Sequence, residues 1–265
     1  MEVQEKKLSA NVHIIDKAFY MPQLQRSRRI WLYLPPEYRT SRQHYPVLYM
    51  QDGQNLFEDW SAFGEEWRVD ETLNAQKNKC IVVGIDNGID KRLNEYTLHD
   101  HERYGRGEGA QYLSFLVNTL KPYIDETYRT LPGREHTFIA GSSLGAVISF
   151  YATLYCPETF AAAGIFSPAF WIAPDLERET RTNAEQNNPL PLRYYFYWGR
   201  REGAEMASDA TIITDLLKTY EHCTLKTVIN EKGTHNEKEW GAAFPRFYKW
   251  LMQKEKNRSK VRSNE

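Results

Sequence analysis

The residues of this chain that are best suited to nucleophilic chemistry lie in the pentapeptide Gly141–Gly145, which reads Gly-Ser-Ser-Leu-Gly. Apolar residues typical of a strand precede it, and a helix-like stretch follows it. Glycines on both sides of a central serine allow a sharp turn that holds this serine strained and exposed. The pattern therefore predicts that Ser143 is a nucleophile at the start of a helix, whose N-terminus favours developing negative charge.

A serine nucleophile needs a base, and two histidines follow Ser143 in the sequence. His235 lies in a polar turn between an expected strand, Thr224–Ile229, and a final helix. His222 lies where a polar helix leads into a strand, a position that favours a solvated or capping role. We therefore predict that His235 is the base.

The acid that orients the base should follow a strand on the same side of the sheet. Glu202 is the first carboxylate after an expected strand, Tyr194–Trp198, and we predict it as this acid. Glu205 and Asp209 are the alternatives. A surface ion pair with a neighbouring arginine is the other interpretation of Glu202.

An oxyanion formed at the serine needs backbone N–H donors. The residue after the nucleophile, Leu144, should supply one of them. The strand Pro46–Met50 leads into a loop in which Gly53 permits a sharp turn, and we predict the Gln54 N–H as the second donor. An ordinary Asp-Gly turn is the simpler interpretation of this loop.

Five further residues are expected to contact the substrate or to shape its pocket. Asp52 and Gly53 lie in the predicted oxyanion loop. Phe170 and Trp171 follow an expected strand near the nucleophile, and plain packing is the other interpretation of these two residues. Arg92 is expected either to support the floor of the pocket or to form a structural ion pair.

The segment His99–His101, which reads His-Asp-His, could suggest a metal site. A metal needs a third and a fourth ligand, and no histidine or cysteine at a suitable spacing accompanies this segment. The glycine-rich segment 105–109 lacks the lysine and the serine or threonine of a phosphate-binding loop. We therefore predict no metal and no other cofactor.

These residues require a sheet whose strands end at a common edge. The expected strands alternate with helices, which favours a mostly parallel sheet covered by helices, with two antiparallel strands at the start. Apolar residues recur at helical spacing between Tyr112 and Ile124, which predicts one long helix there, and a further helix is expected over Thr211–Tyr220. A polar surface helix and loop is expected over residues 179–188.

Several blocks of the chain resemble, in order, the esterase D and enterochelin esterase-like group of α/β-hydrolases. The blocks are Arg29–Tyr38, Tyr45–Phe57, Arg92–Thr97, Gly141–Gly145, Phe166–Trp171 and Gly233–Trp240. The resemblance implies the α/β-hydrolase fold, the Ser143, His235 and Glu202 triad, and the Gln54 and Leu144 oxyanion donors. It also implies substrates as varied as siderophore lactones, plant-wall feruloyl or acetyl esters, S-formylglutathione and sugar acceptors of acyl groups.

Composition fits one globular unit, which we expect over residues 1–253, with a disordered tail over 254–265. The chain has 265 residues, of which 41% are hydrophobic, and a formal net charge of −1, which argues against nucleic acid as a partner. No apolar run approaches the length of a membrane span. The three cysteines have no metal or redox spacing, and we expect reduced thiols and a cytoplasmic location. The sequence makes no prediction of oligomeric state.

Together these features predict a serine-dependent carboxylic ester hydrolase that acts through an acyl-enzyme on a small-molecule ester. The alternatives are an acyltransferase, in which an alcohol or a sugar replaces water, and a non-catalytic binding module on the same scaffold.

Overall fold

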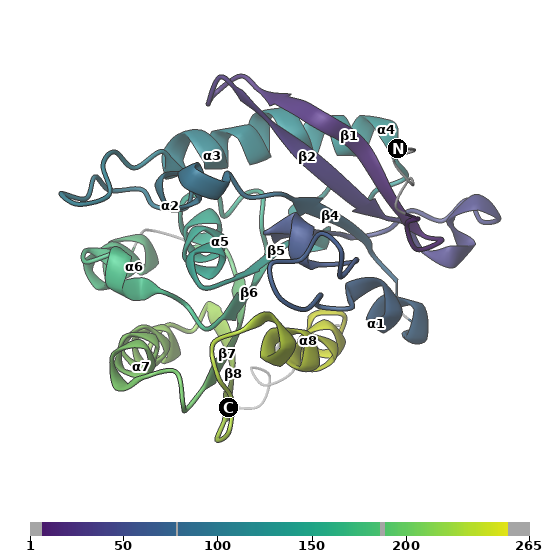
Figure 1. Ribbon diagram of the computed structural model, residues 1–265. Coiled ribbons are helices and arrows are strands. Elements are labelled where there is room, and N and C mark those ends of the chain that lie inside the picture. Colours follow the sequence, from purple (N-terminus) through teal and green to yellow (C-terminus); the bar gives the residue numbers. More distant parts are fainter. Residues whose placement is uncertain (1–6, 78, 186–188, 254–265) are drawn as a thin grey trace, which may run out of the picture.

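The fold is described from a computed structural model, in which residues 7–77, 79–185 and 189–253 are described. These residues contain an eight-stranded sheet with the strand order β1-β2-β4-β3-β5-β6-β7-β8 (Figure 1). The strands are β1 (Val12–Met21), β2 (Arg26–Tyr33), β3 (Val47–Gln51), β4 (Ile81–Ile85), β5 (Thr137–Ser142), β6 (Ala162–Phe166), β7 (Leu192–Gly199) and β8 (Cys223–Asn230).

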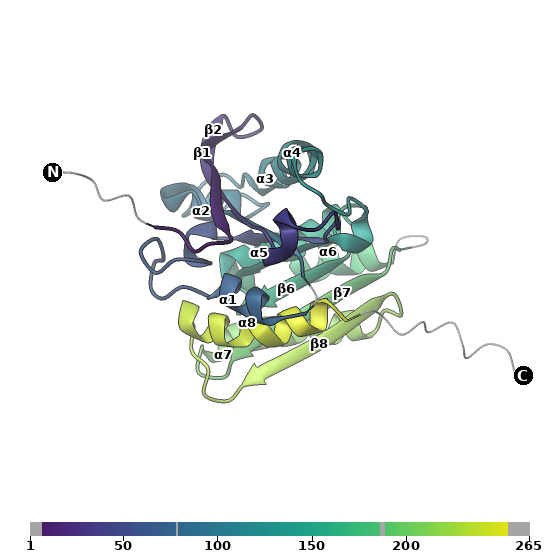
Figure 2. The same ribbon diagram turned by 90° about the vertical axis from the view of Figure 1, so that its right-hand side faces the viewer.

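Six of these strands, from β4 across to β8, run parallel to one another. The strand β2 pairs antiparallel with both β1 and β4, so within this sheet β2 alone runs the opposite way, and β1 and β2 form a hairpin at one edge, opposite β8 (Figure 2). The sheet therefore confirms the predicted α/β architecture with antiparallel N-terminal strands. In a parallel sheet the carboxyl ends of the strands share one edge, so the loops that follow β3, β5, β7 and β8 can meet there.

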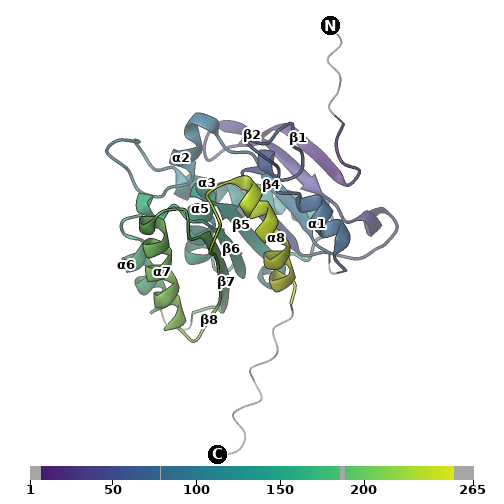
Figure 3. The same ribbon diagram turned by 60° about the horizontal axis from the view of Figure 1, so that its bottom comes forward.

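Helices cover both faces of the sheet (Figure 3). They are α1 (Val69–Ala75), α2 (Arg92–Glu95), α3 (Gly109–Phe115), α4 (Lys121–Thr127), α5 (Leu144–Tyr155), α6 (Leu176–Ala184), α7 (Ala204–Lys218) and α8 (Glu237–Leu251). The side chains of α1 and α8 belong to one apolar cluster, and those of α3, α5 and α7 belong to another on the opposite face. Every residue of β3, β4, β5 and β6 is buried, as expected for strands covered on both faces.

The edge strand β8 differs from these central strands. It pairs only with β7, and none of its residues is fully buried. Its carboxyl end nevertheless leads directly into the loop that carries His235.

Two helix predictions need correction. The helix expected from Tyr112 to Ile124 is interrupted by a π-helical turn at Leu116–Leu120, directly before α4. Pro122 lies in the first turn of α4, and because proline has no N–H it cannot make a regular α-helical bond there. The helix expected over Thr211–Tyr220 is α7, which begins seven residues earlier at Ala204.

Other expectations concern the periphery. The helix expected over 179–188 is α6, and residues 186–188 and the expected tail at 254–265 lie outside the described residues. Cys80, Cys156 and Cys223 are free thiols. Every helix in the described part of the chain is too short or too polar to cross a lipid bilayer.

Candidate active site

Ser143 lies between β5 and α5 in a backbone conformation that non-glycine residues rarely adopt. Its φ is 55° and its ψ is −121°. Its N–H donates to the Phe166 carbonyl at 2.9 Å, and its carbonyl accepts from Ala146 at 3.1 Å and from Ala169 at 3.2 Å. These bonds fix the turn on both sides, so the strained serine is held at the N-terminus of α5.

The glycines on either side of this serine lie in crowded positions. A Cβ added to Gly141 would collide with the carbonyl group of Gly145, because the chain folds back on itself between the two residues. A Cβ on Gly145 would lie 3.0 Å from a carboxylate oxygen of Asp52. The sharp turn predicted from the Gly-Ser-Ser-Leu-Gly pattern is therefore the turn that the chain makes.

His235 and Glu202 meet across the carboxyl ends of β7 and β8. Nδ1 of His235 lies 2.8 Å from Oε2 of Glu202. The Glu202 side chain is fully buried, whereas the His235 side chain is 40% exposed. The buried carboxylate thus holds one ring nitrogen, and the imidazole ring remains accessible.

A short network fixes the Glu202 carboxylate. Its second oxygen, Oε1, accepts from the Ser167 hydroxyl at 2.9 Å and from the Gly199 N–H. The Ser167 hydroxyl accepts in turn from the Trp240 indole N–H at 2.8 Å, and the Trp240 ring packs edge-on against His235. Sequence reasoning assigned no role to Ser167 or Trp240. The position of Ser167, directly after β6 at the carboxyl edge, is the signal that could have found it.

A close approach of two glycines aligns the loops that carry Glu202 and His235. A Cβ on Gly199 would collide with the backbone of Gly233. In addition, the Arg201 N–H donates to the Gly233 carbonyl at 3.1 Å. This contact joins the end of β7 to the loop after β8, so Glu202 and His235 face each other.

Ser143 and His235 line the same cavity, which has a volume of about 630 Å³. Most of the lining residues lie at or just after the carboxyl ends of β3, β4, β5 and β8, and Arg29 comes from β2. The lining residues are Arg29, Asp52, Gln54, Asn55, Ser61, Phe63, Asp86, Asn87, Ile89, Arg92, Ser142, Ser143, His235, Glu237 and Trp240.

The two predicted oxyanion donors lie at the starts of helical turns. Gln54 is in a single 3₁₀ turn, Gly53–Asn55, directly after β3, and Leu144 is the first residue of α5. N–H groups at these positions have no acceptor within their own helix. Gln54 lines the cavity, and Leu144 directly follows the cavity-lining Ser143.

Asp52 and Arg92 form an ion pair at the floor of the cavity. Arg92 donates to both carboxylate oxygens of Asp52, at 2.7 and 2.8 Å, and Asn87 donates to Asp52 at 2.7 Å. Arg92 therefore forms an ion pair, and both members of the pair line the cavity. Gly53 lies beside the cavity lining, where its Cα packs against the backbone of β4.

The structure does not bring Phe170 and Trp171 into this cavity. The Phe170 ring is buried in the core against Phe150 and Phe196. The Trp171 side chain is 52% exposed, and its nearest ring neighbour is Tyr104. The chain turns after β6 through a short helical segment, which directs one ring inward and the other toward the surface loop at Tyr104.

The alternative acids and the His-Asp-His segment lie elsewhere. Glu205 and Asp209 are on α7, and only Glu202 among the three candidates bonds to His235. Nε2 of His99 lies 2.9 Å from a carboxylate oxygen of Glu179, and Nδ1 of His101 accepts from a backbone N–H. The described residues contain no group of three or more histidine, cysteine, aspartate or glutamate side chains suited to a metal.

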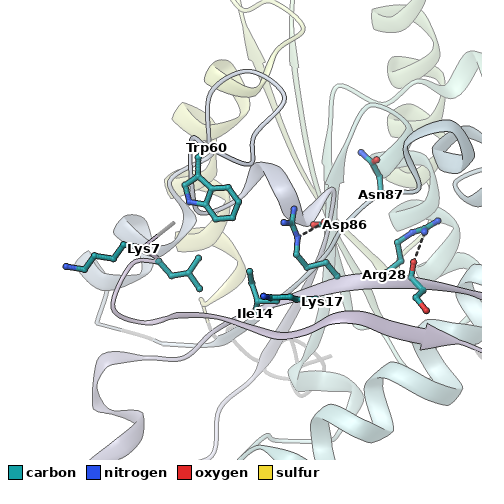
Figure 4. Close-up of a pocket in the computed structure, with 10 residues that line it drawn as sticks. Lys7, Ile14, Lys17, Arg28, Trp60, Asp86 and Asn87 are labelled. Carbon is teal, nitrogen blue, oxygen red and sulfur yellow. Dashed lines mark hydrogen bonds and ion pairs between the residues drawn. The ribbon is translucent and has the colours of Figure 1, made fainter. Parts of the chain in front are cut away.

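A second cavity, of about 1060 Å³, adjoins the first and shares Arg29, Asp86 and Asn87 with it. Lys7, Lys17 and Arg28 add positive charge to its lining, and Trp60 adds an aromatic ring (Figure 4). The guanidinium of Arg29 donates to Asp86 at 2.8 Å, so the wall between the two cavities is an ion pair.

A family model for Esterase matches residues 22–251. The chain belongs to the Esterase family. As a member of this family, the protein is a carboxylic ester hydrolase. Among curated relatives, this esterase is 30% identical over 188 residues to protein YbbA of Bacillus subtilis, which covers 69% of this chain and 72% of that protein. It is also 27% identical to the iron(III) salmochelin esterase of Escherichia coli, over 57% of this chain and 34% of that protein.

Solved structures share the fold of this esterase. The BES protein of Bacillus cereus superposes with a TM-score of 0.78 at 17% identity, over 95% of this chain and 98% of that one. The siderophore hydrolase EstB of Aspergillus nidulans gives a TM-score of 0.69 at 16% identity, over 92% and 96% of the two chains. The enterochelin esterase of Shigella flexneri gives 0.70 at 18% identity, over 94% of this chain and 60% of that one.

Proposed function

We propose that this esterase hydrolyses its substrate through a covalent acyl-enzyme formed on Ser143. The observation that carries the proposal is the shared cavity of Ser143 and His235, together with the 2.8 Å contact between His235 Nδ1 and the buried Glu202 carboxylate. A serine and a histidine that line one cavity, with a carboxylate held against the histidine, are the parts of a nucleophilic triad.

In the first half of the reaction, the Ser143 oxygen attacks the ester carbonyl carbon and its proton passes to Nε2 of His235. Nδ1–H of His235 donates to Glu202, which stabilises the imidazolium as it forms. The N–H groups of Gln54 and Leu144 donate to the carbonyl oxygen as it becomes an oxyanion, and one such donor contributes roughly 3–4 kcal/mol in a comparable site. The C–O bond then breaks, and the leaving alcohol takes the proton from His235.

In the second half, a water molecule attacks the acyl group on Ser143. His235 takes a proton from this water, and the tetrahedral intermediate collapses to the free acid. The proton returns to the Ser143 oxygen, so the enzyme is regenerated without a cofactor. Salmochelin and siderophore esterases among the similar proteins support a small-molecule ester as the substrate.

The test is intact mass after treatment with a fluorophosphonate, applied to wild type, Ser143→Ala and Ser142→Ala. We expect one adduct on wild type and on Ser142→Ala and none on Ser143→Ala. Hydrolysis of p-nitrophenyl acetate should fall by roughly four orders of magnitude in Ser143→Ala, while its circular dichroism stays that of wild type. An adduct on Ser143→Ala, or none on wild type, would refute the proposal.

A further inference from the structure

Two large apolar side chains stand almost fully in solvent at the cavity that contains Ser143. Phe63 and Ile89 are each 89% exposed, and both line this cavity. They come from different parts of the chain, since Phe63 lies in the loop before α1 and Ile89 follows β4. An apolar surface left in water beside a reactive serine is available to an apolar part of the substrate.

The backbone holds Ile89 in this position at a cost. Its φ is 53°, in the left-handed region that β-branched residues strongly disfavour. Its N–H donates to Oδ1 of Asn87 at 2.9 Å, which fixes the turn. Strain of this kind persists where the surrounding structure enforces it, and it gathers at functional sites.

The same kind of anchor holds Phe63. Its N–H donates to Oδ1 of Asn55 at 2.9 Å, and Asn55 is buried beside Gln54. On the other side, the Asn87 N–H donates to Oε1 of Gln54 at 3.2 Å. Asn55 therefore links Phe63 to the loop that carries Gln54, the predicted oxyanion donor. Asn87 links Ile89 to the same loop.

The charged side chains of the cavity largely neutralise one another. Arg92 pairs with Asp52, and Arg29 pairs with Asp86. Glu237 accepts a hydrogen bond from Asn55 at 3.5 Å. Four of the five aspartate, glutamate and arginine side chains in this lining are thus paired with one another, and the two exposed apolar side chains offer a further surface that can discriminate among substrates.

We propose that Phe63 and Ile89 form an apolar clamp that selects esters bearing an aryl or extended alkyl group next to the reacting carbonyl. This inference rests on the proposed function. A second copy of the chain is a poorer occupant, because the chain neighbours Glu65, Asp90 and Lys91 are polar and stable interfaces need a much larger apolar area. Both side chains instead line the cavity that contains Ser143, where an apolar group of the substrate can contact them.

The test compares a bulky ester with a small one on each side of the carbonyl. The pairs are phenyl acetate with ethyl acetate, and methyl 3-phenylpropanoate with methyl acetate. We expect Phe63→Ser and Ile89→Asn each to lower the kcat/KM ratio of at least one pair about tenfold. Asparagine tolerates a positive φ, so Ile89→Asn removes the side chain without changing the turn. Ile212→Asn, which replaces an exposed isoleucine on α7, is the matched control and should leave both ratios unchanged.

A binding measurement separates failure of the clamp from failure of the proposed function. The dissociation constant of 3-phenylpropan-1-ol, measured by NMR titration, should rise about tenfold in Phe63→Ser and stay unchanged in Ile212→Asn. The inference would be overturned if both clamp variants kept the wild-type kcat/KM ratios and the wild-type dissociation constant. It would also be overturned if the variants changed only the oligomeric state. If wild type hydrolyses no ester, the proposed function fails and the binding measurement alone decides the clamp.

Discussion

The Glu202 carboxylate is fully buried, yet it lies 2.8 Å from a ring nitrogen of the half-exposed His235. Burial removes competing water from this contact, and the Ser167 hydroxyl and the Gly199 N–H satisfy the other carboxylate oxygen. A buried charge is tolerated only where such partners exist. The buried carboxylate therefore fixes the orientation of the imidazole ring.

The first prediction concerns the choice of acid. Glu202→Gln should lower kcat about a thousandfold, because an amide cannot stabilise the imidazolium and can donate to Nδ1, which favours the wrong tautomer. Glu205→Gln and Asp209→Asn should keep nearly full activity, since neither side chain bonds to His235. Steady-state kinetics on p-nitrophenyl acetate will distinguish the three variants. A loss in Glu205→Gln equal to that in Glu202→Gln would contradict the assignment.

The second prediction concerns stability and pH. Burial and the charge of Glu71 raise the pKa of Asp70 to about 7, and one carboxylate oxygen of Asp70 is buried without a hydrogen-bond partner. The folded state then binds this proton more tightly than the unfolded chain, whose aspartate pKa is about 3.9. Its contribution to stability is fully present below pH ~4 and is lost as the pH rises through 7.

Asp70→Asn should therefore have a higher melting temperature than wild type at pH 8. The difference between the two melting temperatures should be smaller at pH 5. Burial similarly raises the pKa of Glu66 to about 7, so part of the pH dependence will remain in this variant. Thermal scans between pH 5 and 8 measure the effect. Asp215→Asn on the exposed face of α7 is the control, and an equal gain there would show that Asp70 is not the cause.

The third prediction concerns the strain at Ile89. Ile89→Asn should stabilise the fold by about 1 kcal/mol, since asparagine adopts a positive φ at lower cost than a β-branched residue. Chemical denaturation measures this change. Ile212→Asn places the same substitution in α7 and should give no gain. A loss of stability in Ile89→Asn would mean that the turn is not strained.

Much of the fold follows from the sequence because the central strands are short, continuous apolar runs. The runs at β3, β4 and β5 can only be buried on both faces, and the Gly-Ser-Ser-Leu-Gly turn fixes where β5 meets α5. The start of α7 is harder to predict from the sequence, because most side chains in its first two turns are small or polar. The sequence does not predict the roles of Ser167 and Asn87, because these roles depend on which loops from different strands come together in the fold.

Phe170 is expected in the cavity from its place in the sequence, but it lies in the core. Its place in the chain, just after β6, suggested the cavity, but the direction of its ring is set by packing against Phe150. Distance along the sequence from a strand end predicts which edge of the sheet a residue occupies. It does not predict whether the side chain turns into the cavity or into the core.

The half-exposed edge strand β8 has a consequence for how this esterase would lose activity. Ser143 is carried by β5, at the centre of the sheet, whereas His235 depends on a strand with one neighbour and little burial. Such edges open locally at a lower free energy than the core. On gentle heating, detachment of β8 would carry His235 away from Ser143 while the centre of the sheet stays intact. Activity would then be lost at a lower temperature than the circular dichroism signal of the helices. Ligands that contact both His235 and Ser143 would protect activity more than they raise the melting temperature of the whole fold.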